Sequence, residues 1–269
     1  MKHITLDCYG ASQHSLNNLT IIYQLLNELA YEYELEPIAP PHLIPYYYGR
    51  VKEDSGISAY VLLKGGHITI HTFPIRECYF VDVFTMKDVN EDEIYEYFLD
   101  NLPFSKKNSN FEVINRIDNT FDMLPYSRDI DFGPHLMTKI ESNKEQTMES
   151  IFDFLEKIVI DINMDPIIRA CVIKNRTENP EFISGIIIIA QSHIAIHYDI
   201  KTRLIYSDIF SCAPFDYRIV EDILSHLGKI ISNSLVPRGT KHIYKVKSMV
   251  TDLELKASTQ WQKNIGVNK

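Results

Sequence analysis

Apolar and polar residues alternate with the period of a β-strand in some segments of this chain and with the period of an α-helix in others. Residues 3–9 alternate as a strand does, whereas residues 16–33 carry apolar side chains at helical spacing. The same criteria predict strands at 57–63, 67–73, 79–85 and 111–117, and a helix with an acidic first turn at 90–101. Residues 118–132 break this pattern, and we interpret them as a linker.

The same order of elements begins again after the linker. The pattern predicts helices at 147–163 and 218–234. It predicts strands at 134–140, 167–174, 184–190, 193–198, 204–210 and 242–248. Each half then follows the order β-α-β-β-β-α-β if one of the strand assignments is wrong.

Residue identities also indicate two copies of one unit. His67-Ile-Thr-Ile-His71 recurs as His193-Ile-Ala-Ile-His197, which is an offset of 126 residues. The same offset, without a gap, relates three further pairs: Ser58 and Ser184, Asp82 and Asp208, and Phe84 and Phe210. A gap-free match across three predicted strands indicates a tandem duplication. We therefore predict a first repeat at 1–118 and a second repeat at 130–269.

Two positions break the duplication in a way that bears on chemistry. Gly66 of the first copy corresponds to Ser192 of the second, and Met86 corresponds to Cys212. A hydroxyl and a thiol therefore occur at these positions in the second copy alone. Chance placement of Ser192 in a turn, and of Cys212 as a small buried residue at a strand end, are the alternatives to a catalytic role.

The repeated histidines raise the question of a metal site. Two histidines four residues apart share one face of a helix and can hold one ion. On a strand the same two side chains lie about 13 Å apart, because each residue advances the strand by about 3.3 Å. No metal is therefore expected unless histidines meet across a sheet. The remaining alternative is that they are polar residues on the less buried face of a sheet.

Composition and charge narrow the class of protein. A chain of 269 residues can bury one large core or two modest ones. Its hydrophobic share of 45% and charged share of 23% are typical of a globular protein, and its net charge of −9 argues against nucleic acid and anionic membrane as partners. Neither a membrane-spanning apolar stretch nor a signal peptide is recognisable, so we predict a cytoplasmic protein. The four cysteines lack zinc-type spacing and are interpreted as reduced thiols: Cys8, Cys78, Cys171 and Cys212.

The segment from Ser184 to His197, followed by Ser207-Asp-Ile-Phe-Ser-Cys212, resembles the core of the prokaryotic S-adenosylmethionine decarboxylase family. The spacings match the family motifs at four positions of the second copy: Ser184, Ser192, His197 and Cys212. The first copy matches at Ser58, His67, His71-Thr-Phe-Pro74 and Asp82-Val-Phe-Thr85, but not at Gly66 or Met86. The resemblance covers nearly all of the chain.

The resemblance implies an enzyme whose cofactor is a pyruvoyl group made from its own chain. In the family, a serine attacks the preceding carbonyl, and elimination then cuts the chain and leaves a pyruvoyl group. Here the cut would fall between Gln191 and Ser192 and would release residues 192–269, a fragment of 78 residues. The ketone so formed condenses with a substrate amine and accepts the electrons released as CO₂ leaves.

The resemblance also implies that each site combines residues of both copies. One complete set consists of Ser192 as pyruvoyl precursor, Cys212 as general acid, His71 as base and Ser58 as hydrogen-bonding partner. The reciprocal set pairs Gly66 and Met86 with the vestigial Ser184 and His197. Glycine has no nucleophile and a thioether has no acidic proton, so we expect one working site and one dead site per chain.

The departures from the family concern substrate recognition. The glutamate that holds the ribose in the family is replaced by Ile75 in the first copy and Lys201 in the second, which cannot accept two hydroxyl hydrogen bonds. The adenine-stacking phenylalanine falls at Lys52 or Glu178, although residues 46–48, three tyrosines, could substitute for it. Three hypotheses therefore remain.

The first hypothesis is decarboxylation of S-adenosylmethionine, feeding spermidine synthesis. The second is decarboxylation of another amino acid, such as ornithine or arginine, whose cationic side chain could meet Glu53 or Asp54. The third is a non-catalytic relative with a binding or regulatory role. The predicted fold class is α+β: two tandem repeats forming a four-layer αββα sandwich, as a monomer or a homodimer with a small amino-acid-type substrate.

Overall fold

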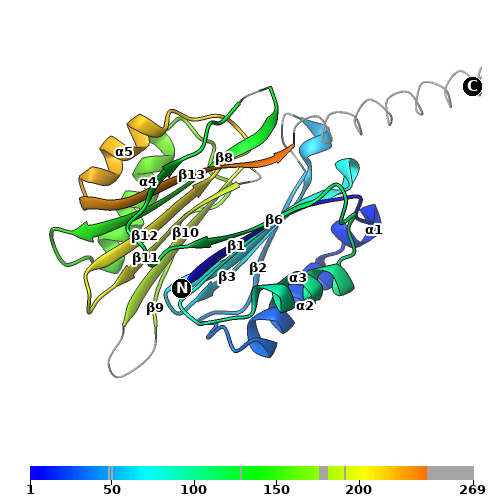
Figure 1. The fold of residues 1–269 in the computed structure, drawn as a ribbon, viewed down its shortest axis with the longest axis horizontal. Coiled ribbons are helices and arrows are strands. Elements are labelled where there is room, and N and C mark those ends of the chain that lie inside the picture. Colours follow the sequence, from blue (N-terminus) through cyan, green and yellow to red (C-terminus); the bar gives the residue numbers. More distant parts are fainter. Residues whose placement is uncertain (48, 50, 128, 176–180, 191, 241–269) are drawn as a thin grey trace, which may run out of the picture.

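Two sheets lie face to face in this protein, and helices cover their outer faces (Figure 1); all strand pairs are antiparallel in the described residues except β7 with β13, which is parallel. The computed structural model describes residues 1–240, apart from 48, 50, 128, 176–180 and 191. The first sheet is built from the first copy and the second sheet from the second copy. The predicted α+β class with an αββα arrangement is confirmed.

The first sheet has six strands in the order β2-β3-β4-β5-β1-β6. Its strands are β1 (Lys2–Tyr9), β2 (His42–Tyr46), β3 (Gly56–Leu63), β4 (Gly66–Phe73), β5 (Cys78–Thr85) and β6 (Asn110–Asn115). Its helices are α1 (Gln13–Leu16), α2 (Leu19–Glu32) and α3 (Glu91–Asn101). Two short 3₁₀ turns, η1 (Lys52–Asp54) and η2 (Pro74–Arg76), flank β3 and β4 at one end.

The second sheet has seven strands in the order β7-β13-β8-β12-β11-β10-β9. Its strands are β7 (Phe121–Met123), β8 (Asp131–Ser142), β9 (Cys171–Lys174), β10 (Phe182–Ile189), β11 (Ser192–Asp199), β12 (Leu204–Phe210) and β13 (Gly228–Thr240). Its helices are α4 (Met148–Asp161) and α5 (Tyr217–Ser225). Without β7, the strand order matches that of the first sheet position by position, as expected for a duplicated unit.

Strand alternation explains the four layers. In β3, Ile57, Ala59 and Val61 join the core beneath α2 and α3, while Tyr60 and Leu62 face the second sheet. Because both faces of the central strands are covered, these strands are apolar almost throughout instead of strictly alternating. Helix α2 buries a matching apolar stripe, and the Asn18 side chain caps its start by accepting hydrogen bonds from two backbone N–H groups.

Several predicted elements differ from the structure. The helix predicted at 16–33 is divided into α1 and α2, and the predicted linker at 118–132 contains β7 and the first residues of β8. Strand β2 was not predicted, and β9 begins at Cys171 instead of 167. The strand predicted at 242–248 lies outside the described residues. The proposed division at 1–118 and 130–269 stays a prediction.

The helix predicted at 218–234 is wrong in its C-terminal half. Helix α5 ends at Ser225, and β13 begins three residues later at Gly228. A β carbon on Gly228 would lie 2.1 Å from the Glu141 carbonyl oxygen, so the close approach of β13 to β8 requires glycine here. Pairing with β8 through eleven residues of β13 therefore overrides the apolar spacing that looked helical.

Apolar clusters occupy both ends of the layer between the sheets. One contains Tyr60, Leu62, Ile186, Ile188 and Ala195. The other contains Tyr9, Phe73, Cys78, Phe80, Phe132 and Phe210. Between them the layer is polar: its buried members include six histidines, two aspartates and two arginines, listed as His3, His67, His71, His135, His193, His197, Asp82, Asp208, Arg116 and Arg238. In the part of the chain that the structure describes, no helix is long and apolar enough to cross a membrane.

Candidate active site

Ser192 and Cys212 are brought together at one end of the second sheet. Ser192 is the first residue of β11, and Cys212 follows the end of β12, which pairs with β11. The Cys212 backbone N–H donates a hydrogen bond to Ser192 Oγ at 2.9 Å, and Cys212 Sγ donates to the Ala190 carbonyl at 3.4 Å. The thiol therefore lies directly against the serine and the chain segment that precedes it.

The surroundings of Cys212 keep its thiol protonated. Burial raises the pKa of Cys212 above its ordinary value, and the hydrogen bond with Ser192 offsets part of this rise. The charges of Asp54 and Arg76 make smaller contributions to this pKa, in opposite directions. A protonated thiol can serve as a proton donor at neutral pH.

Ser58 and His71 form a second pair in the first sheet. They face each other across β3 and β4, and Ser58 Oγ lies 2.9 Å from His71 Nδ1. Both side chains are completely buried. Burial and the neighbouring His193 lower the pKa of His71 well below its ordinary value, so the imidazole is uncharged and can accept a proton at neutral pH.

His193 contacts the Ser58–His71 pair across the interface between the sheets. His71 Nε2 lies 3.0 Å from His193 Nδ1, and His193 directly follows Ser192 in β11. The two imidazole rings stack, with centroids 5.3 Å apart. The Ser58–His71 pair therefore reaches, through His193, the strand that begins with Ser192, although adjacent side chains of a strand point to opposite faces.

The reciprocal set is only half present. Ser184 Oγ lies 2.9 Å from His197 Nδ1, and His197 Nε2 lies 2.9 Å from His67 Nδ1, which mirrors the arrangement around His71. A β carbon at Gly66 would lie 2.1 Å from the Phe84 carbonyl oxygen. The backbone at Gly66 therefore leaves no room for a serine side chain.

The histidines do not lie on a less buried face of a sheet, so that alternative is wrong. The six that lie between the sheets are fully buried. Sequence reasoning also missed the carboxylates and arginines that surround them, although the repeat of Asp82 at Asp208 was a usable signal. Strand spacing alone does not show which side chains of two sheets meet.

Asp82 and Asp208 have different partners although they occupy equivalent positions. Arg238 Nη1 donates to Asp82 Oδ1 at 2.5 Å, and Arg238 Nε donates to Asp7 Oδ1 at 2.7 Å. Burial would raise the pKa of Asp82, but Arg238 and His135 hold it well below its ordinary value. Asp208 instead lies among histidines, and His193 Nε2 is 3.1 Å from its Oδ2. Burial would raise the pKa of Asp208, but the neighbouring His67 and hydrogen bonds with His135 and His193 hold it well below its ordinary value.

Three groups of buried side chains are close enough to be considered as metal ligands. They are His3, Asp82 and His135; His3, His67 and Asp208; and His135, His193 and Asp208. Arg116 Nη1 lies 3.2 Å from His3 Nδ1, and Arg238 Nη1 lies 3.0 Å from His135 Nδ1. Each guanidinium can only donate, so Nδ1 accepts and the proton resides on Nε2. Each of the three groups includes His3 or His135, whose Nε2 then has no lone pair for a metal, so none of the groups supplies a complete set of ligands in this arrangement.

The residues predicted to bind substrate lie near the 3₁₀ turns. Ile75 is half-buried in η2, and Asp54 of η1 forms an ion pair with Arg76 of η2, with Nη2 to Oδ1 at 2.6 Å. Asp54 therefore already has a cationic partner within the chain. Tyr46 lies in β2, and the Tyr47 hydroxyl donates a hydrogen bond to Asn17. Tyr48, Glu178 and Gln191 lie outside the described residues, whereas Lys201 is exposed in a turn.

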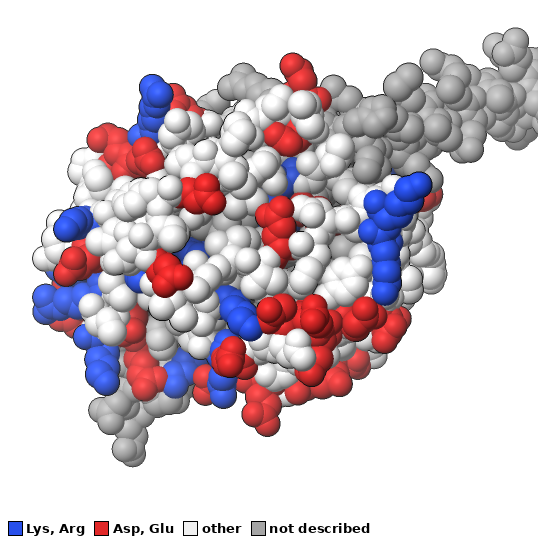
Figure 2. Space-filling view, in the orientation of Figure 1, with Lys and Arg blue, Asp and Glu red and all other residues white. Residues whose placement is uncertain are grey.

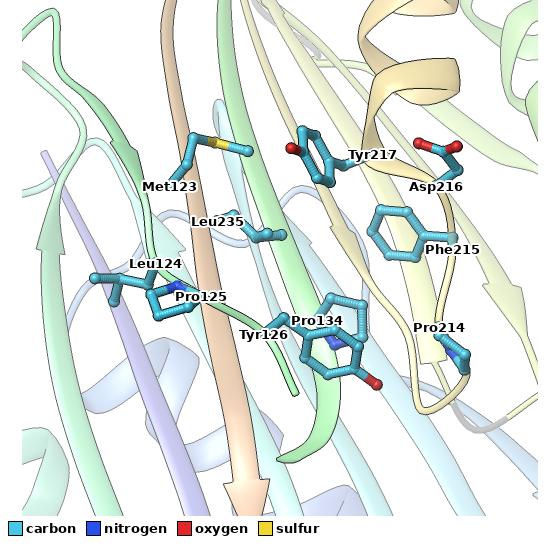
Figure 3. Close-up of a pocket in the computed structure, with 10 residues that line it drawn as sticks. All are labelled: Met123, Leu124, Pro125, Tyr126, Pro134, Pro214, Phe215, Asp216, Tyr217 and Leu235. Carbon is cyan, nitrogen blue, oxygen red and sulfur yellow. The ribbon is translucent and has the colours of Figure 1, made fainter. Parts of the chain in front are cut away.

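A pocket of about 400 Å³ lies elsewhere on the second copy (Figure 3). Side chains of the β7 segment, β13 and the start of α5 line it, among them Met123, Phe215 and Tyr217. None of the four candidate catalytic residues takes part in its lining. On the face shown in Figure 2, acidic side chains gather over the helices of the first copy, and basic side chains are scattered.

Comparison with known proteins agrees with this geometry. The family model described as S-adenosylmethionine decarboxylase matches residues 2–116 and again residues 137–230. Two Clostridium botulinum proteins called S-adenosylmethionine decarboxylase proenzyme, from strains Langeland and Okra, are 28% identical to this chain over 105 residues. That match covers 39% of this chain and 84% of each relative, so each relative corresponds in length to one copy.

A crystal structure of the adenosylmethionine decarboxylase from Aquifex aeolicus VF5 is also similar. It matches with a TM-score of 0.35 and 24% identity, covering 40% of this chain and 92% of that chain.

Proposed function

This chain belongs to the S-adenosylmethionine decarboxylase family, and from that premise we propose that it is a pyruvoyl-dependent decarboxylase that cuts itself between Gln191 and Ser192. The observation that carries the proposal is the survival of one complete set of groups. Ser192 contacts Cys212, Ser58 contacts His71, and His71 contacts His193, the residue that follows Ser192 in β11. The reciprocal set lacks both the hydroxyl and the thiol, so only one of the two sites has kept all of its groups.

Self-processing begins with Ser192. Its Oγ attacks the Gln191 carbonyl carbon, the C–N bond breaks, and an ester replaces the amide while the serine nitrogen becomes an amine. A base then removes the Ser192 α-proton and the Cβ–O bond breaks, which releases Gln191 as a new carboxyl terminus. Water replaces the nitrogen of the remaining dehydroalanine, so ammonia leaves and a pyruvoyl group remains. His71 is the base in this scheme because it is uncharged, buried and hydrogen-bonded to Ser58.

In turnover, the pyruvoyl group would supply the electron sink for loss of CO₂ from an amino acid. Cys212 donates the proton that replaces CO₂ on the substrate α-carbon. Its thiol is held in the protonated form by burial and lies against Ser192, the residue that would carry the group. The aromatic end of the sheet interface, with Phe73, Phe80 and Phe210, keeps water from one side of this region.

S-adenosylmethionine is the first substrate to test, and spermidine synthesis is the corresponding role. A second candidate, a smaller basic amino acid such as ornithine or arginine, is favoured by one observation. Ile75, which is half-buried in η2, has no group that could accept hydrogen bonds from the ribose hydroxyls of S-adenosylmethionine. Release of CO₂ from the three compounds, measured side by side, decides between the candidates.

One chain carries both halves of the site, so we propose that a monomer suffices for activity. We also place the enzyme in the cytoplasm. The four cysteines are free thiols, which fits a reducing compartment.

Intact mass of the purified protein tests the proposal. Self-processing yields residues 1–191 and 192–269, with the smaller chain blocked to N-terminal sequencing. Ser192→Ala abolishes the cut. Ser58→Ala slows it, whereas Ser184→Ala, the matched change in the dead site, leaves it intact. A single chain of 31.2 kDa in a preparation that releases CO₂, or equal loss of cutting in the Ser58 and Ser184 variants, contradicts the proposal.

A further inference from the structure

We propose that Asp208 is a positioning residue for self-processing: through His193 it determines which nitrogen of His71 presents a lone pair to Ser58. This inference rests on the proposed function and adds a role for residues behind the reacting groups.

The side chains of four residues are joined by a continuous, buried series of hydrogen bonds that crosses from one sheet to the other: Asp208, His193, His71 and Ser58. Asp208 Oδ2 lies 3.1 Å from His193 Nε2, His193 Nδ1 lies 3.0 Å from His71 Nε2, and His71 Nδ1 lies 2.9 Å from Ser58 Oγ. All four residues are completely buried. Bulk water therefore does not compete for these contacts.

The Asp208 carboxylate at one end of this series of hydrogen bonds determines which ring nitrogens of the two histidines carry protons. A carboxylate only accepts, so His193 must donate to Asp208 from Nε2. In the tautomer of His193 that carries its proton on Nε2, Nδ1 accepts, and His71 donates to it from Nε2. His71 Nδ1 is left with a lone pair, and the Ser58 hydroxyl donates to it. Asp208 thus makes His71 a base on the side that faces Ser58.

The equivalent branch behind the dead site has the opposite polarity. Ser184 Oγ donates its proton to the Leu63 carbonyl at 3.1 Å, so it accepts from His197 Nδ1. His197 Nε2 then accepts from His67 Nδ1, and His67 Nε2 carries a lone pair. That nitrogen points at Asp208 Oδ2 from 3.4 Å without forming a hydrogen bond, as two acceptors would. The same four residue types are therefore arranged as a base in one branch and not in the other.

Asp208, and not its counterpart Asp82, can orient the histidines because Asp82 already accepts hydrogen bonds from other side chains. Asp82 accepts from Arg238 and from Thr69 Oγ1, at 2.5 and 3.4 Å. The residue equivalent to Thr69 is Ala195, which has no hydroxyl. Arg116 donates to the Thr138 and Ser207 carbonyls and to His3, and its hydrogen bonds do not reach Asp208.

Asp208 also stabilises the charge that the step creates. When His71 takes a proton at Nδ1, the imidazolium still donates from Nε2 to His193. The positive charge of His71 then interacts, through the hydrogen bond with His193, with the Asp208 carboxylate in a buried site.

Two matched variants test the role of this branch. His193→Phe removes the link between Asp208 and His71, and His67→Phe makes the same change of side chain at the equivalent, equally buried position of the dead branch, where it removes the hydrogen bond to His197. We expect His193→Phe to slow self-cleavage about 100-fold or more, the usual size of a general-base contribution, and His67→Phe to change it less than about 3-fold. His193→Gln, whose amide can donate and accept, recovers part of the rate. Equal slowing in the two Phe variants, despite equal melting temperatures, overturns the inference.

A second readout separates positioning from a merely structural role. If His71 acts in the elimination, His193→Phe accumulates the ester at Ser192, and hydroxylamine cuts that ester but not an amide. Hydroxylamine therefore releases the 192–269 fragment from His193→Phe and not from Ser192→Ala. Absence of hydroxylamine-sensitive material in uncut His193→Phe contradicts the inference.

Nitrogen NMR distinguishes failure of this inference from failure of the proposed function. In Ser192→Ala, the His71 Nδ1 resonance should be that of an unprotonated imidazole nitrogen, and Asp208→Asn should alter it. A wild-type chain that is never cut contradicts the proposed function, whereas a protonated His71 Nδ1 in Ser192→Ala contradicts the positioning role alone.

Discussion

Replacing Arg238 by methionine should be among the most destabilising single changes in this chain. Arg238 reaches from β13 of the second copy to two carboxylates of the first, Asp7 and Asp82, and its Nη2 also donates to the Val81 carbonyl at 3.2 Å. Its side chain is 1% exposed, and those of Asp7 and Asp82 are 2% and 0% exposed. The substitution therefore leaves two buried carboxylates without a cation.

The expected loss follows from that geometry. Removing one partner of a buried ion pair costs about 3–5 kcal/mol, because the remaining charge is left uncompensated. For a domain of this size, about 1 kcal/mol corresponds to roughly 2–4 °C, so the melting temperature should fall by about 10 °C. Arg169→Met, the same change at an exposed ion pair with Glu156, should cost less than about 1 kcal/mol.

The loss should depend on pH in a defined direction. The folded pKa of Asp82 is held well below its ordinary value, so this group stabilises the fold above about pH 4, its unfolded pKa, and the stabilisation is lost as pH falls through the folded pKa. Without Arg238, burial raises the folded pKa of Asp82 instead. The deficit of Arg238→Met should therefore grow from pH 4 towards pH 8.

Urea unfolding in the uncut Ser192→Ala background measures these differences on one covalent chain. A triple variant that also carries Asp7→Asn and Asp82→Asn should lose less stability than Arg238→Met alone, because no charge is left buried. The reasoning is refuted if Arg238→Met loses less than about 1 kcal/mol at pH 8, or if the triple variant is less stable than the single one.

Two further predictions concern the two sites. Gly66→Ser should lower the melting temperature and produce no second cut, because its β carbon would lie 2.1 Å from the Phe84 carbonyl oxygen; a third fragment on intact mass analysis would show otherwise. Cys212→Ala should leave self-cleavage within about 3-fold, since the backbone N–H that contacts Ser192 remains, but should lower the rate of CO₂ release or product protonation about 100-fold. Because burial raises the pKa of the Cys212 thiol, the wild-type rate should stay level from neutral pH past about pH 8.5, the ordinary pKa of a cysteine thiol; a decline beginning near pH 7 would contradict the role of Cys212 as an acid.

Much of the fold could be predicted because most of its strands and helices show their own period of apolar residues in the sequence. The strands that carry the site, β3, β4, β10 and β11, were all predicted to within two residues, since each is a short apolar run bounded by turn residues. The end of the chain was predicted poorly. Residues 228–234 have spacing compatible with a helix, and only pairing with β8 makes them a strand.

The residues of the candidate site could be predicted, but not all of the hydrogen bonds that connect them. The spacing of Ser192 and Cys212, and of Ser58 and His71, singled out all four residues, and the structure places each pair in contact. Nothing in the spacing indicated that His193 would contact His71.

The sequence by itself determined that the chain is a duplicated α/β unit and that only one copy retains a serine and a cysteine at the decisive positions. These are properties of residue identity and of the two-residue period of a strand, which sets the face on which a side chain lies. Only the tertiary structure decided which faces meet. Arg238 binds Asp7 from 231 residues away, and Asp208 contacts His193 rather than an arginine. These partners depend on how the two sheets pack, which no local period records, and they determine which hydrogen bonds the buried histidines can form.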